Sequence, residues 1–272
     1  EFRRGLFRSY TATVDAEGKW AATVPSADLT GLKDGDASVQ VSVTNVNGNA
    51  ASSAQAFSVD TTAPTVTINT ISGDNMLNAA EAAQDLTLSG TSTAEAGQTV
   101  TVIFNGNQYT AQVQADGSWT LDVPAADLAG ITDGGVAVTA TVSDKAGNPA
   151  SAGSSVLVDT TVPQISFNIV AGDDIVNIAE HGQALIVSGK VTGAQAGDVI
   201  TLTLNGKDYT TTVSADGSWT LNVPAADLAG LTDGSVTVTA SVSDKAGNPA
   251  SVDHTLMVDV TVPAVTIHTV AG

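Results

Sequence analysis

Cysteine is absent from this chain of 272 residues, so disulfide bonds contribute nothing to its stability. Basic side chains are scarce: nine lysines and arginines stand against 28 aspartates and glutamates, which gives a formal net charge of −19 at pH 7. Nucleic acids and anionic membranes are bound through basic patches, and this charge argues against both kinds of partner. The same charge is compatible with the binding of hard divalent cations.

Long apolar runs and catalytic motifs are missing as well. No segment approaches the ~20 apolar residues of a membrane-spanning helix, so we expect no membrane insertion. His181, His254 and His268 are scattered, and they form no zinc-binding or catalytic-triad pattern. Aromatic residues make up only 4% of the chain, and the tryptophans recur at one strand position, which favours core packing over a sugar-binding platform. We therefore expect a protein that is not an enzyme.

What the chain does contain is a repeat. The segment Val-Asp-Thr-Thr-Val-Pro at 158–163 recurs with small changes at 59–64 and 258–263. Its aspartates are 99 and 100 residues apart (159 − 60 and 259 − 159), a length that can bury its own core. Threonine and valine favour extended backbone, and proline fixes φ and restricts its predecessor. Each copy predicts a strand end, a carboxylate and a short stiff linker into the next strand.

The repeat divides the chain into four predicted segments. A partial unit at 1–61 precedes two full units at 62–161 and 162–261, and 262–272 begins a following unit. Residues 1–8 contain all three arginines and match no part of the repeat, so we interpret them as foreign sequence, with a divergent native strand as the alternative. The partial unit lacks about three strands, and we expect it to be marginally stable alone.

The second unit alternates short apolar segments with turn residues. Asn105-Gly106 is a strong signal for a type I′ hairpin, and Asp116-Gly117 marks another tight turn. The predicted strands cover 65–71, 86–90, 100–104, the segment that holds Tyr109 and Val113, 119–123, 136–142 and 155–158. Seven strands with turns at this spacing predict an all-β, immunoglobulin-like β-sandwich, and tandem copies predict a head-to-tail rod.

The third unit repeats the second closely. Residues 115–150 and 215–250 differ only at Asp122/Asn222, Ile131/Leu231, Gly135/Ser235, Ala137/Thr237 and Thr141/Ser241. These are mild changes, so we expect the two units to serve the same purpose.

Counting strands up and down places carboxylates at the ends of each sandwich. The loop after the first strand should lie beside the end of the last strand, and both should face the opposite end of the next unit. Asp159 should then approach Asp216, Asp244 and Asn248, just as Asp60 should approach Asp116, Asp144 and Asn148. Clustered carboxylates repel one another unless a cation lies among them, and calcium takes six to eight oxygen ligands.

Further candidate calcium ligands lie in the loop after the first strand and at the last junction: Asp74, Asn75, Asn78, Glu81, their equivalents Asp173, Asp174, Asn177 and Glu180, and Asp259. An alternative holds for Asp116 and Asp216, because aspartate before glycine is common in turns for backbone reasons alone. Asp127 and Asp227 are better explained as caps of a turn.

Three phrases carry a resemblance to a known family. Ala-Asp-Gly-Ser-Trp, Ser-Asp-Lys-Ala-Gly-Asn and Val-Asp-Thr-Thr-x-Pro, within a match that runs from Tyr10 onward, resemble the bacterial Ig-like repeats of very large adhesins secreted by type I exporters of the RTX kind. The glycine-rich nonapeptide calcium repeats of such exporters' secretion signals are absent from this chain.

The resemblance implies a secreted rod of many repeats on the bacterial surface, with calcium at its domain junctions. The implied partners are neighbouring repeats, the type I secretion machinery and, through the full-length protein, the host cell surface. The alternative is that the Ig-like repeats themselves bind a host receptor or glycan.

Overall fold

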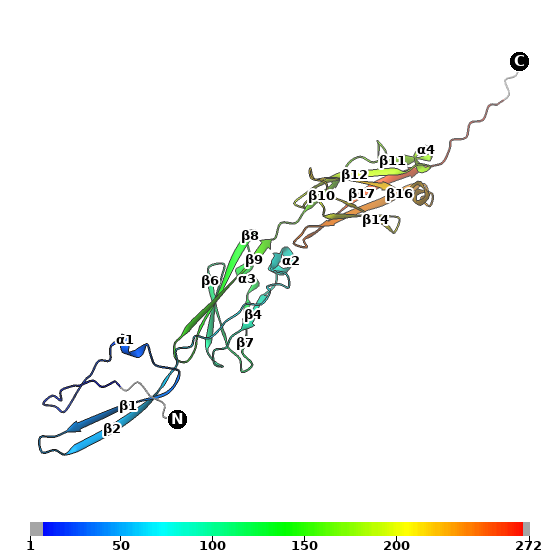
Figure 1. The fold of residues 1–272 in the computed structure, drawn as a ribbon. Helices are drawn as coiled ribbons and strands as arrows, with labels where there is room; N and C mark the ends of the chain where they lie inside the picture. The colour runs from blue at the N-terminus through cyan, green and yellow to red at the C-terminus, as the bar shows by residue number, and fades with distance from the viewer. Residues whose placement is uncertain (1–7, 269–272) are drawn as a thin grey trace.

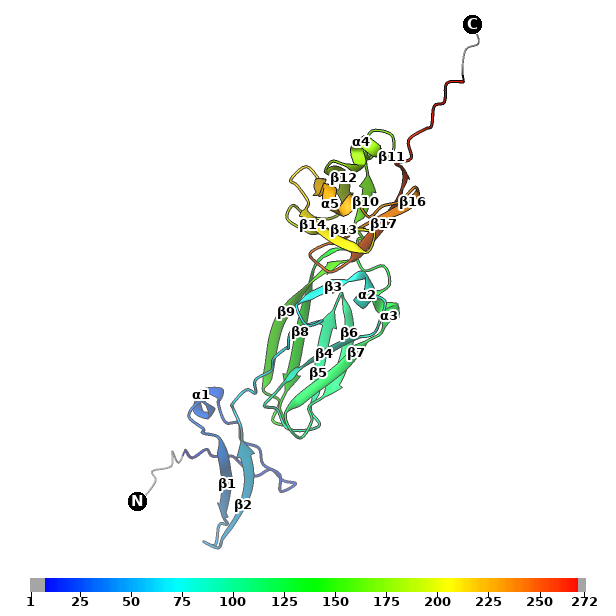
Figure 2. The same cartoon turned by 90° about the vertical axis from the view of Figure 1, so that its right-hand side faces the viewer.

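The computed structural model describes residues 8–268, in which three units follow one another end to end (Figure 1, Figure 2). The expectation of foreign sequence at 1–8 lies almost entirely outside the described residues, as do the last four residues of the predicted following unit. No helix in the described part of the chain has the length and apolar character needed to cross a bilayer.

The first unit contains a helical turn and one hairpin, α1 (Ser26–Leu29), β1 (Gly35–Thr44) and β2 (Ala50–Val59). Its Tyr10 hydroxyl donates to the Asp28 carboxylate at 2.8 Å, just as Tyr109 donates to Asp127 at 2.9 Å in the second unit. This shared contact supports the alignment of the two units. Trp20 of the first unit is nevertheless 50% exposed, because no second sheet covers it among the described residues.

The second unit is a sandwich of two sheets. Its elements are β3 (Met76–Asn78), α2 (Ala79–Ala82), β4 (Leu86–Thr91), β5 (Thr99–Phe104), β6 (Asn107–Gln112), β7 (Ser118–Val123), α3 (Ala125–Leu128), β8 (Gly134–Ser143) and β9 (Pro149–Asp159). One sheet has the order β3-β9-β8-β5-β6, and the other pairs β4 with β7. Residues 65–69 extend the smaller sheet through backbone hydrogen bonds to β4.

The third unit repeats this arrangement. Its elements are β10 (Gln164–Phe167), β11 (Ile175–Asn177), α4 (Ile178–His181), β12 (Leu185–Thr192), β13 (Val199–Leu204), β14 (Lys207–Thr212), β15 (Ser218–Val223), α5 (Ala225–Leu228), β16 (Gly234–Ser243) and β17 (Pro249–Asp259). The sheets are β10-β12-β15 and β11-β17-β16-β13-β14. The predicted tandem of Ig-like β-sandwiches is confirmed.

The polar loop predicted after the first strand contains the short strand β3 and the start of the helical turn α2, neither of which was predicted. Residues 65–69 run antiparallel to β4, and the chain then crosses to the other sheet, where β3 pairs in parallel with β9. Leu77 anchors this short strand in the core and is completely buried. A strand of three residues is too short to show an alternating pattern, so it was predicted as a polar loop.

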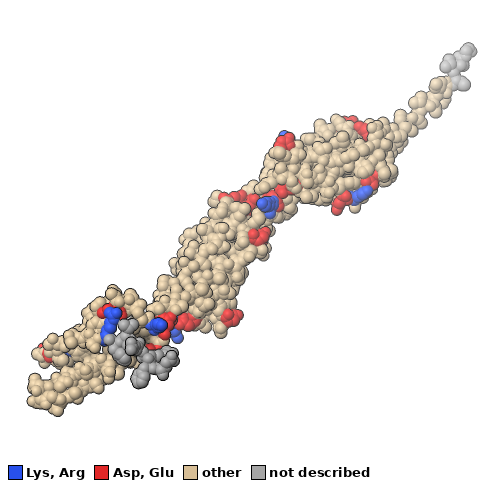
Figure 3. Space-filling model, viewed as in Figure 1, with Lys and Arg blue, Asp and Glu red and all other residues tan. Residues whose placement is uncertain are grey.

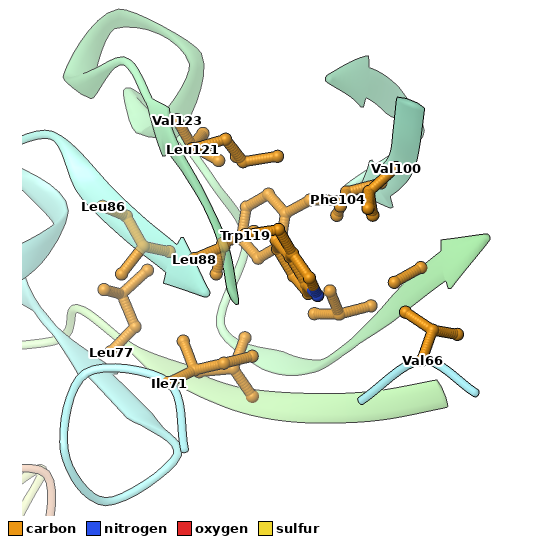
Figure 4. Packing of buried hydrophobic residues seen from close by; sticks show 14 of the residues in the cluster. Val66, Ile71, Leu77, Leu86, Leu88, Val100, Phe104, Trp119, Leu121 and Val123 are labelled. Atoms are coloured by element: carbon orange, nitrogen blue, oxygen red, sulfur yellow. The ribbon is translucent and has the colours of Figure 1, made fainter. Parts of the chain in front are cut away.

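Each full unit has its own hydrophobic core around one tryptophan. Trp119 is fully buried, and Leu88, Phe104 and Val66 lie around it in Figure 4. Its indole N–H donates to the carbonyl oxygen of Thr67 at 3.1 Å, so the ring also ties the first strand to the core. The tryptophans of the full units are packing residues.

Gly90 in β4 gives a test of this core, because Trp119 and the Thr67 backbone cover its α-carbon. A methyl group there would overlap the Thr67 carbonyl oxygen and lie 2.6 Å from a ring carbon of Trp119. We predict that Gly90→Ala destabilises the second unit by about 1–3 kcal/mol through overpacking. Denaturant unfolding measures this loss. Gly153→Ala is the control, since nothing lies within 4 Å of the added methyl group, and equal stability of the two variants would contradict the prediction.

Candidate interdomain junction

The linker between the second and third units is held by an aspartate that precedes β8. One carboxylate oxygen of Asp133 accepts hydrogen bonds from the backbone N–H and the hydroxyl of Thr160, both at 2.8 Å. The other oxygen accepts the Thr161 hydroxyl at 2.6 Å. The Thr161 hydroxyl and the two Thr160 donors hold the pKa of Asp133 below its ordinary value. We call this arrangement the aspartate clamp.

The clamp recurs and was missed by the sequence analysis. Asp34 accepts from Thr61 and Thr62 in the first unit, and Asp233 accepts from Val260 and Thr261 in the third. In each copy the aspartate stands 27 residues before its first partner. This fixed spacing is the signal that could have identified it.

The side chains of the predicted ligand loop after the first strand form local hydrogen bonds. Asp74 accepts the Met76 N–H at 2.8 Å, and Asn75 accepts the Ile71 N–H at 2.9 Å with its own φ at 63°. Asn78 and Glu81 form a capping box on α2. The candidate ligands Asp74, Asn75, Asn78 and Glu81 therefore also fit a turn followed by a helix cap.

The same roles recur in the third unit. Asp173 accepts the Ile175 N–H, and Asn177 with Glu180 forms the capping box of α4. Asp174 accepts the Val170 N–H and lies 2.8 Å from the His254 ring nitrogen, and these two partners lower the pKa of Asp174.

The candidate turns at the opposite end of each sandwich are also internally hydrogen-bonded. Asp116 accepts both the hydroxyl and the N–H of Ser118, which lowers the pKa of Asp116, and Asp216 binds Ser218 in the same way. This is the backbone role that the sequence left open as an alternative. The junction carboxylates behave similarly toward their linkers: Asp60, Asp159 and Asp259 each accept the N–H two residues on.

The loop at 244–248 is where the third unit meets the second. Asp244 accepts the backbone N–H and the side-chain amide of Asn248, both at 2.9 Å. The Asn248 amide also donates to the Asp159 carbonyl oxygen at 2.9 Å, and its oxygen accepts the Ala79 N–H at 2.8 Å. The Asn78 amide adds a bond of 3.2 Å to the Ala246 carbonyl. The predicted approach of Asp159 to this loop is thus observed through backbone and amide groups.

The first junction uses the same loop with fewer contacts. Asp144 accepts from Asn148, which is the main cause of its lowered pKa, and the Asn148 amide donates to the Asp60 carbonyl at 3.1 Å. Residues 8–61 offer no counterpart of Asn78 to extend this contact.

The charge at the junctions bears on metal binding. Within residues 8–268, no three acidic or histidine side chains come close enough to hold a metal ion by themselves. Asp159, Asp244 and Glu81 each lie beside a residue of this interface, and none of them forms a salt bridge in the described part of the chain. Figure 3 shows acidic atoms gathered where successive units meet, with some basic atoms beside them.

This fold and these junctions define a class: tandem, mainly antiparallel β-sandwiches joined by short, hydrogen-bonded linkers. The family model of the bacterial Ig-like domain matches residues 62–160 and 186–260. The chain belongs to the bacterial Ig-like domain family. A search of curated protein sequences gives no match.

Solved structures of adhesin repeats are similar in sequence. A "Ca2+-stabilized adhesin" that "helps an Antarctic bacterium reach out and bind ice" is 37% identical over 90% of this chain, with a TM-score of 0.46. A "1.5-MDa bacterial ice-binding adhesin" is 34% identical over 91% of this chain and 82% of its own, with a TM-score of 0.46. A tetra-tandem repeat from the "extending region of large adhesion protein" is 30% identical over 91% of this chain and 62% of its own, with a TM-score of 0.35.

These similarities rest on sequence identity and not on structural superposition. The chain spans 61% of the first of these structures. The narrower resemblance of the Pro-Ala-Ala-Asp-Leu-Ala-Gly segment to the giant non-fimbrial adhesin of Salmonella receives no support from these matches.

The aspartate clamp predicts a defined pH response. Because folding lowers the pKa of Asp133, its stabilising effect is present above the unfolded-state pKa and is lost as pH falls through the folded one. We expect the Thr160 amide resonance to stay constant at mildly acidic pH and to shift only below the ordinary aspartate value of 3.8. An NMR titration measures this midpoint, and a midpoint above 3.8 would contradict the clamp.

Asp133→Asn should abolish this titration and increase the fast backbone motion of Thr160 and Thr161. Asp122→Asn is the matched control, since the third unit naturally has Asn222 at the equivalent position. It should leave the linker relaxation rates unchanged.

Proposed function

We propose that this chain is part of the extension rod of a large, secreted bacterial surface adhesin, and that calcium stiffens its junctions. The observation that carries the proposal is the junction itself, where Asp159, Asn248 and Ala79 connect two sandwiches through a linker of a few residues. A rod needs repeated domains whose relative orientation is restrained, and domains without such an interface move freely by default. The adhesin repeats of similar sequence support this reading.

The junction residues fit calcium in donor type. The junction contains oxygen donors of the kind that calcium takes: the backbone carbonyls of Asp159 and Ala246 accept asparagine amides there, and the carboxylates of Asp244 and Glu81 bind Asn248 and Asn78. Calcium accepts carboxylates, carbonyls and water together, so it does not require three protein carboxylates in contact. Asp244 is only 8% exposed and has no basic partner among the described salt bridges, which leaves its charge to be offset.

Calcium would supply positive charge that neutralises these carboxylates and links the two domains. We propose Asp60 with Asp144, and Asp159 with Asp244, as the first ligands of the two junctions. The remaining candidates in the turns and in the loops after the first strands, with the exception of Asn248, are proposed as secondary ligands, and Asp259 as a ligand at the end of the third unit. With a Kd of ~0.1 mM and ~1 mM external calcium, each site would add about 1.4 kcal/mol.

The location and partners follow from the same proposal. The chain would act outside the cell on the bacterial surface, after export through a type I system. Its immediate partners are the neighbouring repeats, and host-cell contact belongs to the full-length protein. The proposed role is mechanical and not enzymatic.

Direct sugar binding by the repeats is the weaker alternative. Sugar-binding surfaces commonly use an exposed aromatic ring, and Trp119 and Trp219 are 0% and 1% exposed. Both rings are occupied by core packing. Neither full unit therefore presents its tryptophan to a sugar, and the structure does not favour the alternative.

Small-angle X-ray scattering with and without calcium tests the proposed rod. We predict that calcium increases the maximum dimension of the fragment and narrows its distance distribution, because neutralised junctions bend less. Asp159→Asn should weaken this response at the second junction and leave the unfolding of each sandwich unchanged.

Asp122→Asn is the control for the loss of one negative charge, because it removes a carboxylate within the second sandwich and not at a junction. An unchanged maximum dimension on calcium addition, together with no calcium binding by isothermal titration calorimetry, would sink the calcium proposal.

A further inference from the structure

We propose that Asn248 latches the second sandwich to the third without any cation, and so sets their relative orientation before calcium is bound. The inference deepens the proposed rod function and rests on it only for its biological purpose. Its physical basis is a set of hydrogen bonds between the two units, which we call the Asn248 latch: Asn248 to Asp159 and Ala79, and Asn78 to Ala246.

The first argument is that the hydrogen-bonding groups of Asn248 are used. Its two amide hydrogens go to different partners, the Asp244 carboxylate within its own unit and the Asp159 carbonyl across the junction. Its side-chain oxygen accepts the Ala79 N–H from the second unit. A buried amide is costly unless its partners are present, so separating the domains would leave Asn248 to find new ones.

The second argument is burial, for which the chain contains an internal comparison. Asn248 is 1% exposed and Ala246 is 6% exposed, although both lie in a polar surface loop. The identical loop of the second unit leaves Asn148 half-buried and Ala146 exposed, where the described residues of the first unit, 8–61, offer the Asp60 carbonyl alone. The second sandwich, and not the loop sequence, therefore excludes water from Asn248.

The third argument concerns what the interface requires. A neutral amide donates to both the carbonyl and the carboxylate, so these bonds need no positive ion to form. The side-chain oxygen of Asn248 is already an acceptor for Ala79, and a cation there would compete with that bond between domains. The structure assigns Asn248 to holding the interface and leaves the proposed cation to Asp159 and Asp244.

The register of β3 places the two donors of the second unit, Asn78 and Ala79, beside the linker to the third unit. Asn78 pairs with Asp159 at the end of β9, so the capping residue of α2 and the linker carboxylate lie side by side. Asn78 uses its side-chain oxygen to cap α2 and its amide to reach Ala246. One helix cap thus presents both a side-chain donor and the Ala79 N–H to the next domain.

The absence of cysteine makes the test direct. Spin labels at Gln108→Cys in β6 and Thr210→Cys in β14 report the distance between the two sandwiches by double electron–electron resonance. Both positions are exposed. In chelator, the otherwise unchanged chain should give a single narrow distance distribution.

Ala79→Pro removes one bond of the latch while respecting the local fold. Proline is favoured at the first position of a helix, and Asn78 has the extended backbone (φ −87°, ψ 176°) that precedes proline comfortably. The change deletes the N–H that Asn248 accepts and alters no group of the third unit. We expect loss of the narrow distance peak in chelator. Asn78→Asp keeps the cap acceptor, deletes the donor to Ala246, and should broaden the peak as well.

Ile178→Pro is the matched control, since it places the same change at the first position of α4, at the far end of the third sandwich. It should keep the narrow peak. Thermal unfolding of each variant verifies that both sandwiches remain folded.

The outcomes separate the latch from the calcium proposal. A broad distribution in chelator that calcium narrows would overturn the latch and retain the calcium-stiffened rod. A narrow distribution in chelator that Ala79→Pro leaves intact would also overturn the latch. A narrow distribution in chelator that Ala79→Pro abolishes, with no effect of calcium, would support the latch and reject calcium stiffening.

Discussion

The passage of the chain from the smaller sheet to the larger one after the first strand determines which groups of each sandwich lie at the linker. Residues 65–69 complete the smaller sheet, and β3 then joins the larger sheet beside β9. The sharp turn between them requires a left-handed backbone at Asn75, with φ of 63°, and at Asp174, with φ of 61°. Asparagine and aspartate tolerate this conformation better than other non-glycine residues. This crossover brings the cap of α2 to the linker.

Much of this arrangement was predictable from periodicity. The recurring Val-Asp-Thr-Thr phrase, the Asn105-Gly106 hairpin and the alternating strands carry strong local signals, and they indicated tandem sandwiches joined at Asp159. Head-to-tail reasoning also placed Asp159 near Asn248, which the structure confirms with a bond of 2.9 Å from the asparagine amide to the aspartate backbone. Repeated sequence made these inferences possible, because one unit could be checked against another.

The roles of individual polar residues were less predictable. Asp133 stands 27 residues before Thr160, and the antiparallel pairing of β8 with β9 brings them together. A capping box and a metal-binding loop use the same residue types at similar spacing, so Asn78 and Glu81 could not be assigned by pattern alone. Asparagine is both a donor and an acceptor, and the sequence-based prediction treated Asn78 and Asn248 only as oxygen ligands. Whether an asparagine donates or accepts depends on the groups that it meets in the assembled junction.

The two full units also differ at positions that lie at their junctions. The third unit has Val260 where the second has Thr160, so the Asp233 clamp lacks a hydroxyl donor that Asp133 has. It also has Ile178 where the second unit presents Ala79 to Asn248. These changes alter the hydrogen bonds that hold the linker and the interface. Sandwiches of the same fold can therefore form junctions that differ in their contacts.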